Sequence, residues 1–166
     1  MIVYEDILSE DQLDHVFFER DQILNEGVFT INKLVWPKDM WSGYTGSVYL
    51  KEAGPKITKI VLNILNMNIR MTTEDRRTIK VAHNFWDCNA GINWHEDQHV
   101  QWAATLYLTP EYEKPWGGFL CTRNEVYYPK FNTLVINDNK EEHKVTPILK
   151  KDLPWRHTLQ IFGPIS

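Results

Sequence analysis

The second half of this 166-residue chain is a succession of short strand-like runs, and this pattern constrains the fold more than any other feature. Each run is rich in apolar, aromatic or β-branched residues, and turn signals separate the runs at short intervals. The runs span residues 79–85, 104–108, 118–122, 126–128, 133–136, 144–149 and 156–162. Many short strands with this spacing are typical of a β-sandwich or a jelly roll.

Two helical segments precede the strand-like runs. Ser9-Glu10-Asp11-Gln12 reads as a capping box that opens a helix ending near Gly27. Gly54-Pro55 opens a second helix with an apolar stripe. Residues 28–50, rich in Trp, Tyr and Gly, predict short strands and a flexible loop.

These patterns together predict one α+β domain, mainly β with N-terminal helices, over residues 1–166. Residues 1–78 form a helical support region, and residues 79–163 form the jelly-roll core.

Composition excludes several classes of protein. Hydrophobic residues make up 43% of the chain, which is a globular composition, and the net charge of −4 argues against a broadly basic nucleic-acid surface. The two cysteines, Cys88 and Cys121, predict reduced thiols rather than a disulfide framework. We find no basic, apolar leader and no apolar run of membrane-spanning length. We therefore expect a cytoplasmic protein that binds neither nucleic acid nor a membrane.

His95-Glu96-Asp97 points most directly to chemistry. His95 and Asp97 are two residues apart, so on a β-strand their side chains share a face, and His143 supplies a second imidazole. Two histidines and one carboxylate leave positions open on a metal, as in non-haem Fe(II) oxygenases. Arg156 is a fixed cation that could hold the carboxylate of a co-substrate.

The same segment also matches H-E-x-x-H, the zinc-peptidase motif, with His95 and His99 as ligands and Glu96 as general base. The zinc interpretation needs a helix across residues 92–104, whereas the iron interpretation needs a strand that ends near Asp97. A turn signal just upstream and the charge between the two histidines favour the strand.

The last strand-like run provides a separate indication of a pocket. Alternation puts Arg156, Thr158 and Gln160 on one face and apolar residues on the other. A face of this kind lines a polar pocket or faces solvent at the edge of a sheet.

From about residue 79 to residue 163 the chain resembles the Fe(II)- and 2-oxoglutarate-dependent oxygenases, and most of all their prolyl-4-hydroxylase-like branch. Six pieces occur in the family's order and cover about half the chain. They are Trp94-His95-Glu96-Asp97, Thr105-Leu106-Tyr107-Leu108-Thr109, Trp116-Gly117-Gly118-Phe119, the run from Pro129 to Ile136, His143-Lys144-Val145-Thr146-Pro147 and Arg156-His157-Thr158. The family fold is a double-stranded β-helix, a cupin-like jelly roll, which agrees with the strand pattern.

The resemblance implies a catalytic metal centre in which two imidazoles and one carboxylate hold Fe(II). These ligands are His95, Asp97 and His143. It also implies that Arg156 pairs with the distal carboxylate of the co-substrate 2-oxoglutarate, with Thr158 and Tyr107 adding hydrogen bonds. O₂ would be the oxidant, and ascorbate is a candidate accessory reductant.

The chain departs from the family pattern at three places. Thr109 replaces the usual Asn, and Phe85 stands about where relatives often carry a Tyr hydroxyl near the co-substrate. The stretch between the second metal motif and Arg156 is slightly long and predicts a longer turn at residues 150–152. We assign no role to His15, His83 or His157, because a lone histidine is usually structural or at the surface.

The leading hypothesis is a dioxygenase that hydroxylates a C–H bond of a prolyl or other residue in a peptide or protein. Residues 36–47 are the candidate for a loop that covers the substrate. The alternatives are an oxygenase acting on a free small molecule, a zinc metallopeptidase using His95 and His99, and a non-catalytic jelly-roll binding module. The sequence leaves the oligomeric state open.

Overall fold

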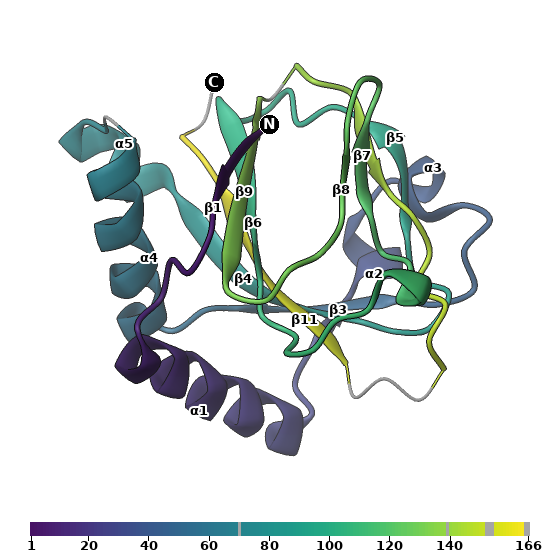
Figure 1. The fold of residues 1–166 in the computed structure, drawn as a ribbon, viewed down its shortest axis with the longest axis horizontal. Helices are drawn as coiled ribbons and strands as arrows, with labels where there is room; N and C mark the ends of the chain where they lie inside the picture. The colour runs from purple at the N-terminus through teal and green to yellow at the C-terminus, as the bar shows by residue number, and fades with distance from the viewer. Residues whose placement is uncertain (70, 139, 152–154, 165–166) are drawn as a thin grey trace.

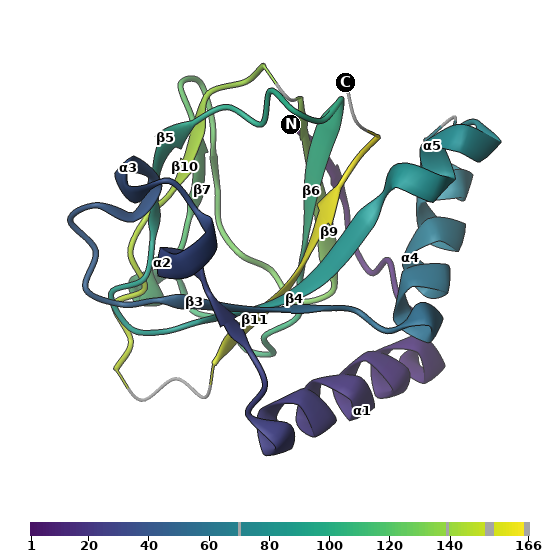
Figure 2. The ribbon, with the colours of Figure 1, turned by 180° about the vertical axis from the view of Figure 1, so that it is seen from behind.

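The structure is a computed structural model that describes residues 1–69, 71–138, 140–151 and 155–164 (Figure 1). Within these residues two antiparallel sheets face each other, and the long helices cover the outer face of the larger sheet (Figures 1 and 2). The chain is therefore mostly β, as predicted. Asp152, in the predicted longer turn, lies outside the described residues.

The larger sheet has seven strands. In spatial order they are β1 (Ile2–Tyr4), β9 (Thr133–Asp138), β6 (Trp102–Tyr107), β11 (Arg156–Phe162), β4 (Lys80–Trp86), β3 (Val48–Glu52) and β2 (Thr30–Ile31). The smaller sheet has the order β5 (Ile92–His95), β10 (His143–Val145), β7 (Leu120–Thr122) and β8 (Val126–Tyr127). A 3₁₀ turn, η1 (Lys114–Trp116), leads into β7.

The helices begin at the local signals in the sequence. Helix α1 (Glu10–Glu26) has the capping box at Ser9, and it ends at Gly27, whose φ of 65° is left-handed. Helix α4 (Pro55–Asn68) starts with Pro55 in its first turn. Helix α5 (Thr73–Thr78) follows it. No helix among the described residues is long and apolar enough to cross a membrane.

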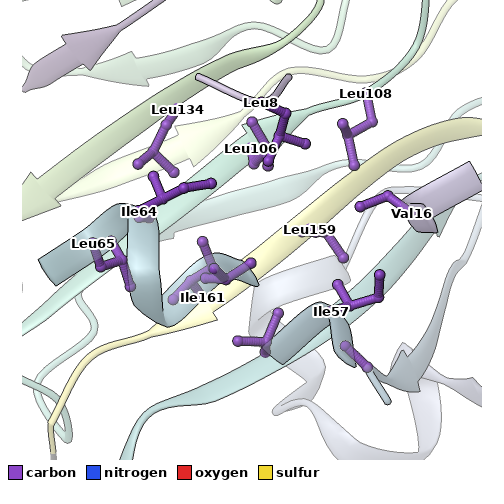
Figure 3. Close-up of a cluster of buried hydrophobic side chains, with 14 of the residues drawn as sticks. Leu8, Val16, Ile57, Ile64, Leu65, Leu106, Leu108, Leu134, Leu159 and Ile161 are labelled. Atoms are coloured by element: carbon purple, nitrogen blue, oxygen red, sulfur yellow. The ribbon is translucent and has the colours of Figure 1, made fainter. Parts of the chain in front are cut away.

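One hydrophobic core lies between the helices and the larger sheet (Figure 3). Ile57, Ile64 and Leu65 of α4 pack against Leu159 and Ile161 of β11. A second cluster lies between the sheets and includes apolar residues of β6, β7, β9 and β10. The alternation predicted for the last strand is confirmed, because its apolar face meets the helices while Arg156 and Gln160 line a cavity between the sheets.

Residues 28–50 differ from the prediction of short strands and a flexible loop. The strands β2 and β3 are present, but the connection contains two one-turn helices, α2 (Asn32–Val35) and α3 (Lys38–Trp41). The amide of Asn93 fixes α3, because its Nδ2 donates to the carbonyl oxygens of Asp39 and Ser42 at 2.7 and 2.9 Å. This tertiary contact thus holds in place a segment that its composition predicted to be a flexible loop.

Candidate metal and co-substrate site

The strands β5 and β10 bring the three predicted metal ligands together. His95 ends β5 and His143 begins β10, and the two residues are direct partners across the antiparallel pair. Asp97 follows two residues after the end of β5. One ligand atom of each of the three side chains lies within 4.8 Å of the others, which is close enough to hold one metal ion.

The helix that the zinc interpretation requires is not formed, because residues 92–95 are strand β5. His99 is exposed, and its ring lies 6.0 Å from that of Phe162. Within the described part of the chain the ligand cluster contains Asp97 and His143 but not His99. The zinc-peptidase arrangement is therefore wrong for this segment.

Backbone carbonyl groups orient both imidazoles. The Nδ1 of His95 lies 2.8 Å from the carbonyl oxygen of Asn93, and the Nδ1 of His143 lies 2.8 Å from that of Glu141. A carbonyl oxygen only accepts, so each Nδ1 must carry a proton, and in the neutral ring this leaves the lone pair on Nε2. The Nε2 atoms of His95 and His143 lie 3.9 and 3.5 Å from the Asp97 carboxylate, so the free lone pairs lie on the side of the third ligand.

Burial lowers the pKa of His95, and the neighbouring His143 lowers it further, against the opposing effects of the Asn93 carbonyl and the Asp97 carboxylate. The neutral imidazole is thereby favoured, and this is the form that binds a metal. Two imidazoles and one carboxylate fit Fe(II) with positions left open for other ligands.

A cavity of about 410 Å³ contains these side chains and extends between the two sheets. Its volume is typical of a small-molecule site. Arg156 of β11, Tyr107 of β6 and Trp86 of β4 line it together with the metal cluster.

Arg156 is almost completely buried, with 1% of its surface exposed. Its Cζ lies 4.6 Å from the ring of Trp86, and its Nη2 donates to the carbonyl oxygen of Gly118 at 3.0 Å. Its Nε and Nη1 have no hydrogen-bond partner, and no carboxylate pairs with it among the described residues. A buried, unpaired cation is costly, so this geometry fits a site for the carboxylate of a bound ligand.

Tyr107 and Thr158, which the sequence also placed at the co-substrate, have different surroundings. Tyr107 is buried in the cavity wall with its ring 5.4 Å from the Cζ of Arg156. Burial raises the pKa of Tyr107 although Arg156 opposes this, so the phenol keeps its proton as a donor. Thr158 is fully buried, and its hydroxyl accepts a hydrogen bond from Trp86 Nε1 at 3.0 Å. Thr158 therefore holds the indole of Trp86, and the Trp86 ring in turn lies against the Arg156 guanidinium.

The assignment of Phe85 to the co-substrate side is wrong by one residue. The register pairs Phe85 with His157, and these rings stack 5.1 Å apart on the helix-facing side of the sheet. Asn84, paired with Thr158, faces the cavity instead. The alternation of a strand exchanges the two faces at each residue, so an error of one position puts the side chain on the wrong side.

Of residues 36–47, only the first part of the segment lines the cavity. Trp36, Pro37 and Met40 line it, with Val35 just before them. The Asn93 hydrogen bonds described above hold this segment against the end of β5. Sequence reasoning also missed three polar residues of the cavity wall, which alternation could have identified once the strand register was known. They are Asn84, Thr105 and Asn137.

No protein-family model matches the sequence, and no curated protein matches it. Solved structures similar over nearly the whole chain are prolyl hydroxylases and members of the 2-oxoglutarate-Fe(II) oxygenase family. The fold is therefore the jelly roll of these oxygenases, and the resemblance read from the sequence is confirmed for the fold.

Three particular structures illustrate the similarity. A Pseudomonas putida prolyl-4-hydroxylase has a TM-score of 0.68 at 14% identity, with 98% of this chain and 91% of that chain covered. A Trichoplax adhaerens prolyl hydroxylase in complex with a peptide fragment of hypoxia inducible factor has a TM-score of 0.73 at 15% identity, with coverage of 98% and 82%. A viral collagen prolyl hydroxylase from Paramecium bursaria Chlorella virus-1, in complex with 2OG, has a TM-score of 0.64 at 11% identity, with coverage of 99% and 95%.

Proposed function

We propose that this protein is an Fe(II)- and 2-oxoglutarate-dependent dioxygenase that hydroxylates a C–H bond in a peptide or protein. The observation that supports this most directly is one cavity holding both a His95–Asp97–His143 cluster and the unpaired guanidinium of Arg156. The cluster fits the metal, and Arg156 fits a carboxylate. A prolyl residue is the first candidate substrate, because structural neighbours include prolyl hydroxylases.

The residues of the cavity have distinct tasks in this proposal. Bound Fe(II), 2-oxoglutarate and O₂ would supply the oxidant that converts C–H to C–OH, with ascorbate as a candidate reductant. Arg156 holds the distal carboxylate of the co-substrate, and Trp86 and Gly118 fix the plane of its guanidinium. Tyr107 donates to the same carboxylate. The buried walls exclude water, which strengthens these interactions.

An oxygenase acting on a free small molecule is the second candidate. Trp36, Pro37 and Met40 line the cavity of about 410 Å³, a volume that suits a small ligand as well as a single side chain. The residues that bind the metal and the co-substrate have the same roles whether the substrate is a peptide or a free small molecule.

An anaerobic titration with Fe(II) tests the proposal. With 2-oxoglutarate present we expect a weak visible charge-transfer band from the chelated complex. Asp97→Ala should abolish the band and Arg156→Ala should weaken it. His99→Ala, an exposed imidazole of the same segment, is the matched control and should keep it. Tight zinc binding without any band, lost in His99→Ala, would overturn the proposal.

A further inference from the structure

The outer face of the smaller sheet points away from the cavity. The long helices α1 and α4 cover the larger sheet, and neither lies over this face (Figures 1 and 2). His143 of β10 lines the cavity, so its neighbour Lys144 points outward. Lys144 pairs with Cys121 of β7, and Cys121 pairs with Val126 of β8. These three side chains therefore form one row across the outer face.

Two aromatic side chains lie beside this row. Phe119 precedes β7 and Tyr128 follows β8, and each is two residues from a member of the row, so alternation puts both on the same face. Their ring centres lie 4.8 Å apart in an edge-to-face arrangement. Val126 and Tyr128 are 51% and 43% exposed, which leaves an apolar strip open to solvent.

Trp94 joins the outer face through an irregularity in β5. The pairing of β5 with β10 shifts register between His143 and Val145, which leaves one extra residue of β5 opposite Lys144. An extra residue of this kind is a β-bulge, and it changes the direction of the side chains around it. The Nζ of Lys144 lies 4.9 Å from the centre of the Trp94 ring, so this ring lies on the outer face.

Two further cations lie over the rings of this face. The Cζ of Arg123 lies 4.0 Å from the centre of the Trp94 ring. The Nζ of Lys114 lies 4.5 Å from the centre of the Tyr128 ring. Because the rings hold these side chains in place, less conformational entropy is lost when a partner binds them.

The positive charge of the outer face contrasts with the net charge of −4 for the whole chain. Arg123 is paired with Glu142, whose Oε2 lies 2.7 Å from its Nη2. Lys114 and Lys144 form no ion pair with any residue that the structure describes. Two free ammonium groups around an apolar strip are complementary to a partner with both carboxylates and an apolar side chain.

We propose that the outer face of the smaller sheet docks an acidic segment of a partner polypeptide. Carboxylates of the segment pair with Lys114 and Lys144, and an apolar side chain packs on Val126 and Tyr128. The strands β10 and β8 are two strand spacings apart, about 10 Å, which about four extended residues span. One short segment therefore reaches both lysines. The inference needs neither metal nor co-substrate, so it is independent of the proposed function.

A single-stranded nucleic acid fits this face less well, although it also binds to cations and aromatic rings. Its bases need open ring faces for stacking, whereas cations already lie over Trp94 and Tyr128. The negative charge of the whole chain also repels a polyanion at long range.

NMR titration of the isotope-labelled full chain, without added metal, tests the inference. The probes are acetyl-Glu-Glu-Leu-Glu-Glu-amide, the same peptide with Gln for every Glu, and a thymidine pentanucleotide of equal charge. We expect the acidic peptide to shift the amide signals of residues 119–128 and of Lys144. It should bind about tenfold more tightly than the Gln peptide, because two ion pairs together contribute about that factor. Raising the ionic strength from about 0.01 M to about 0.15 M should weaken it.

Charge reversal connects the binding to the two lysines. Lys144→Glu and Lys114→Glu should each weaken binding of the acidic peptide at least about threefold. Lys59→Glu, at an exposed position of α4, changes the net charge equally and is the matched control that should keep the affinity. Because Lys114 lies in a short turn outside the strands, its variant tests the inference even if Lys144→Glu does not fold.

Four outcomes would overturn the inference. They are no binding of the acidic peptide, equal binding of the Gln peptide, signal shifts confined to other parts of the protein, and equal loss of affinity in Lys59→Glu. Tighter binding of the pentanucleotide at the same residues would assign the face to nucleic acid and would also contradict the inference. None of these results bears on metal or 2-oxoglutarate binding, which the Fe(II) titration measures separately.

Discussion

At the scale of single residues, Gly118 leaves room for the buried guanidinium of Arg156 because it has no side chain. Its φ is +67°, and an added Cβ would lie 3.2 Å from Arg156 Cζ and 2.6 Å from Ile148 Cδ1. We expect Gly118→Ala to lower the free energy of unfolding by about 1–3 kcal/mol and to weaken 2-oxoglutarate binding. Urea unfolding and co-substrate titration measure the two effects.

Gly27→Ala is the matched control for Gly118→Ala. Gly27 has a φ of +65° and no atom within 4 Å of an added Cβ, so its substitution introduces backbone strain without a clash. If the two variants lost equal stability and both kept their affinity for 2-oxoglutarate, crowding around Arg156 would affect neither the free energy of unfolding nor co-substrate binding.

The Thr158 hydroxyl is a second testable contact. Thr158→Val has a similar shape but removes the acceptor for Trp86 Nε1, and leaves that donor buried without a partner. We expect a loss of about 1–3 kcal/mol in the free energy of unfolding, measured by urea denaturation. Thr158→Ser, which keeps the hydroxyl, should lose less. A similar loss in both variants would assign the effect to packing of the methyl group.

Single residues also show how far sequence reasoning extends. The spacing of His95 and Asp97 predicted that their side chains share a face, the family resemblance implied that His143 joins them, and the structure brings the three together. The carbonyl groups that orient the imidazoles were not predictable, because every residue has a carbonyl and the sequence does not indicate which one is close. Phe85 was misplaced because alternation specifies faces only after one residue of the strand is anchored.

At the scale of elements, a chain of hydrogen bonds joins α1 to the larger sheet behind Arg156. Glu19 Oε1 lies 3.0 Å from His83 Nε2, and His83 Nδ1 lies 2.9 Å from His157 Nε2. Burial raises the pKa of Glu19, but the hydrogen bonds from His83 and the Gly54 amide outweigh this, so its pKa is lowered. With Glu19 ionised, His83 donates to it and His157 donates to His83.

This arrangement predicts a dependence of stability on pH. Burial lowers the pKa of His157 well below 6.5, and His83 and Arg20 lower it further. As the pH falls below about 6.5 the unfolded chain takes up a proton at His157 that the folded protein does not. The free energy of unfolding should therefore decrease by about 1.4 kcal/mol per pH unit from this residue, and the contribution should be absent above that range.

Urea unfolding of metal-free protein between pH 7 and pH 5.5 measures this slope. His157→Gln should reduce the slope, whereas His99→Gln, which removes an exposed imidazole, should keep it. An unchanged slope in His157→Gln would mean that other groups control acid stability.

Helix α3, whose Met40 lines the cavity, offers a prediction about local stability. Asn93→Ala removes both hydrogen bonds that hold α3, so amide hydrogen exchange in residues 38–41 should become faster. Asn63→Ala on the surface of α4 is the control. The helix itself was missed from sequence because a single turn has no periodic pattern and is not stable alone. Unchanged exchange would show that other contacts fix the segment.

Under the proposed function, the whole molecule should be more stable with metal and 2-oxoglutarate than without them. Arg156 is buried, and its Nε and Nη1 have no hydrogen-bond partner among the described residues, so bound 2-oxoglutarate would relieve a cost of the fold as well as adding contacts. In the presence of Mn(II), 2-oxoglutarate at a hundred times its dissociation constant should add about 2.7 kcal/mol. Thermal unfolding detects this increment, which Arg156→Met should remove without affecting the increment from metal alone. A full increment in Arg156→Met would assign the carboxylate to another group.

The jelly-roll class was predictable from strand number and turn spacing, whereas the strand order was not. β11 lies between β4 and β6, and β1 pairs with β9, so partners far apart in the chain determine the sheet. No local pattern specifies such pairings, because they depend on the tertiary packing of both faces. The resemblance to the oxygenase family, which rests on the order of the motifs, implied a strand arrangement that the local propensity of each segment could not specify.

The direct pairing of His95 with His143 has a consequence for biogenesis. A slip of one residue between β5 and β10 would turn one imidazole to the opposite face, and the proposed metal site would lose a ligand. Under the proposed function, a chain with the wrong alignment would therefore fail to bind metal, and correct pairing of the smaller sheet would be a condition for activity.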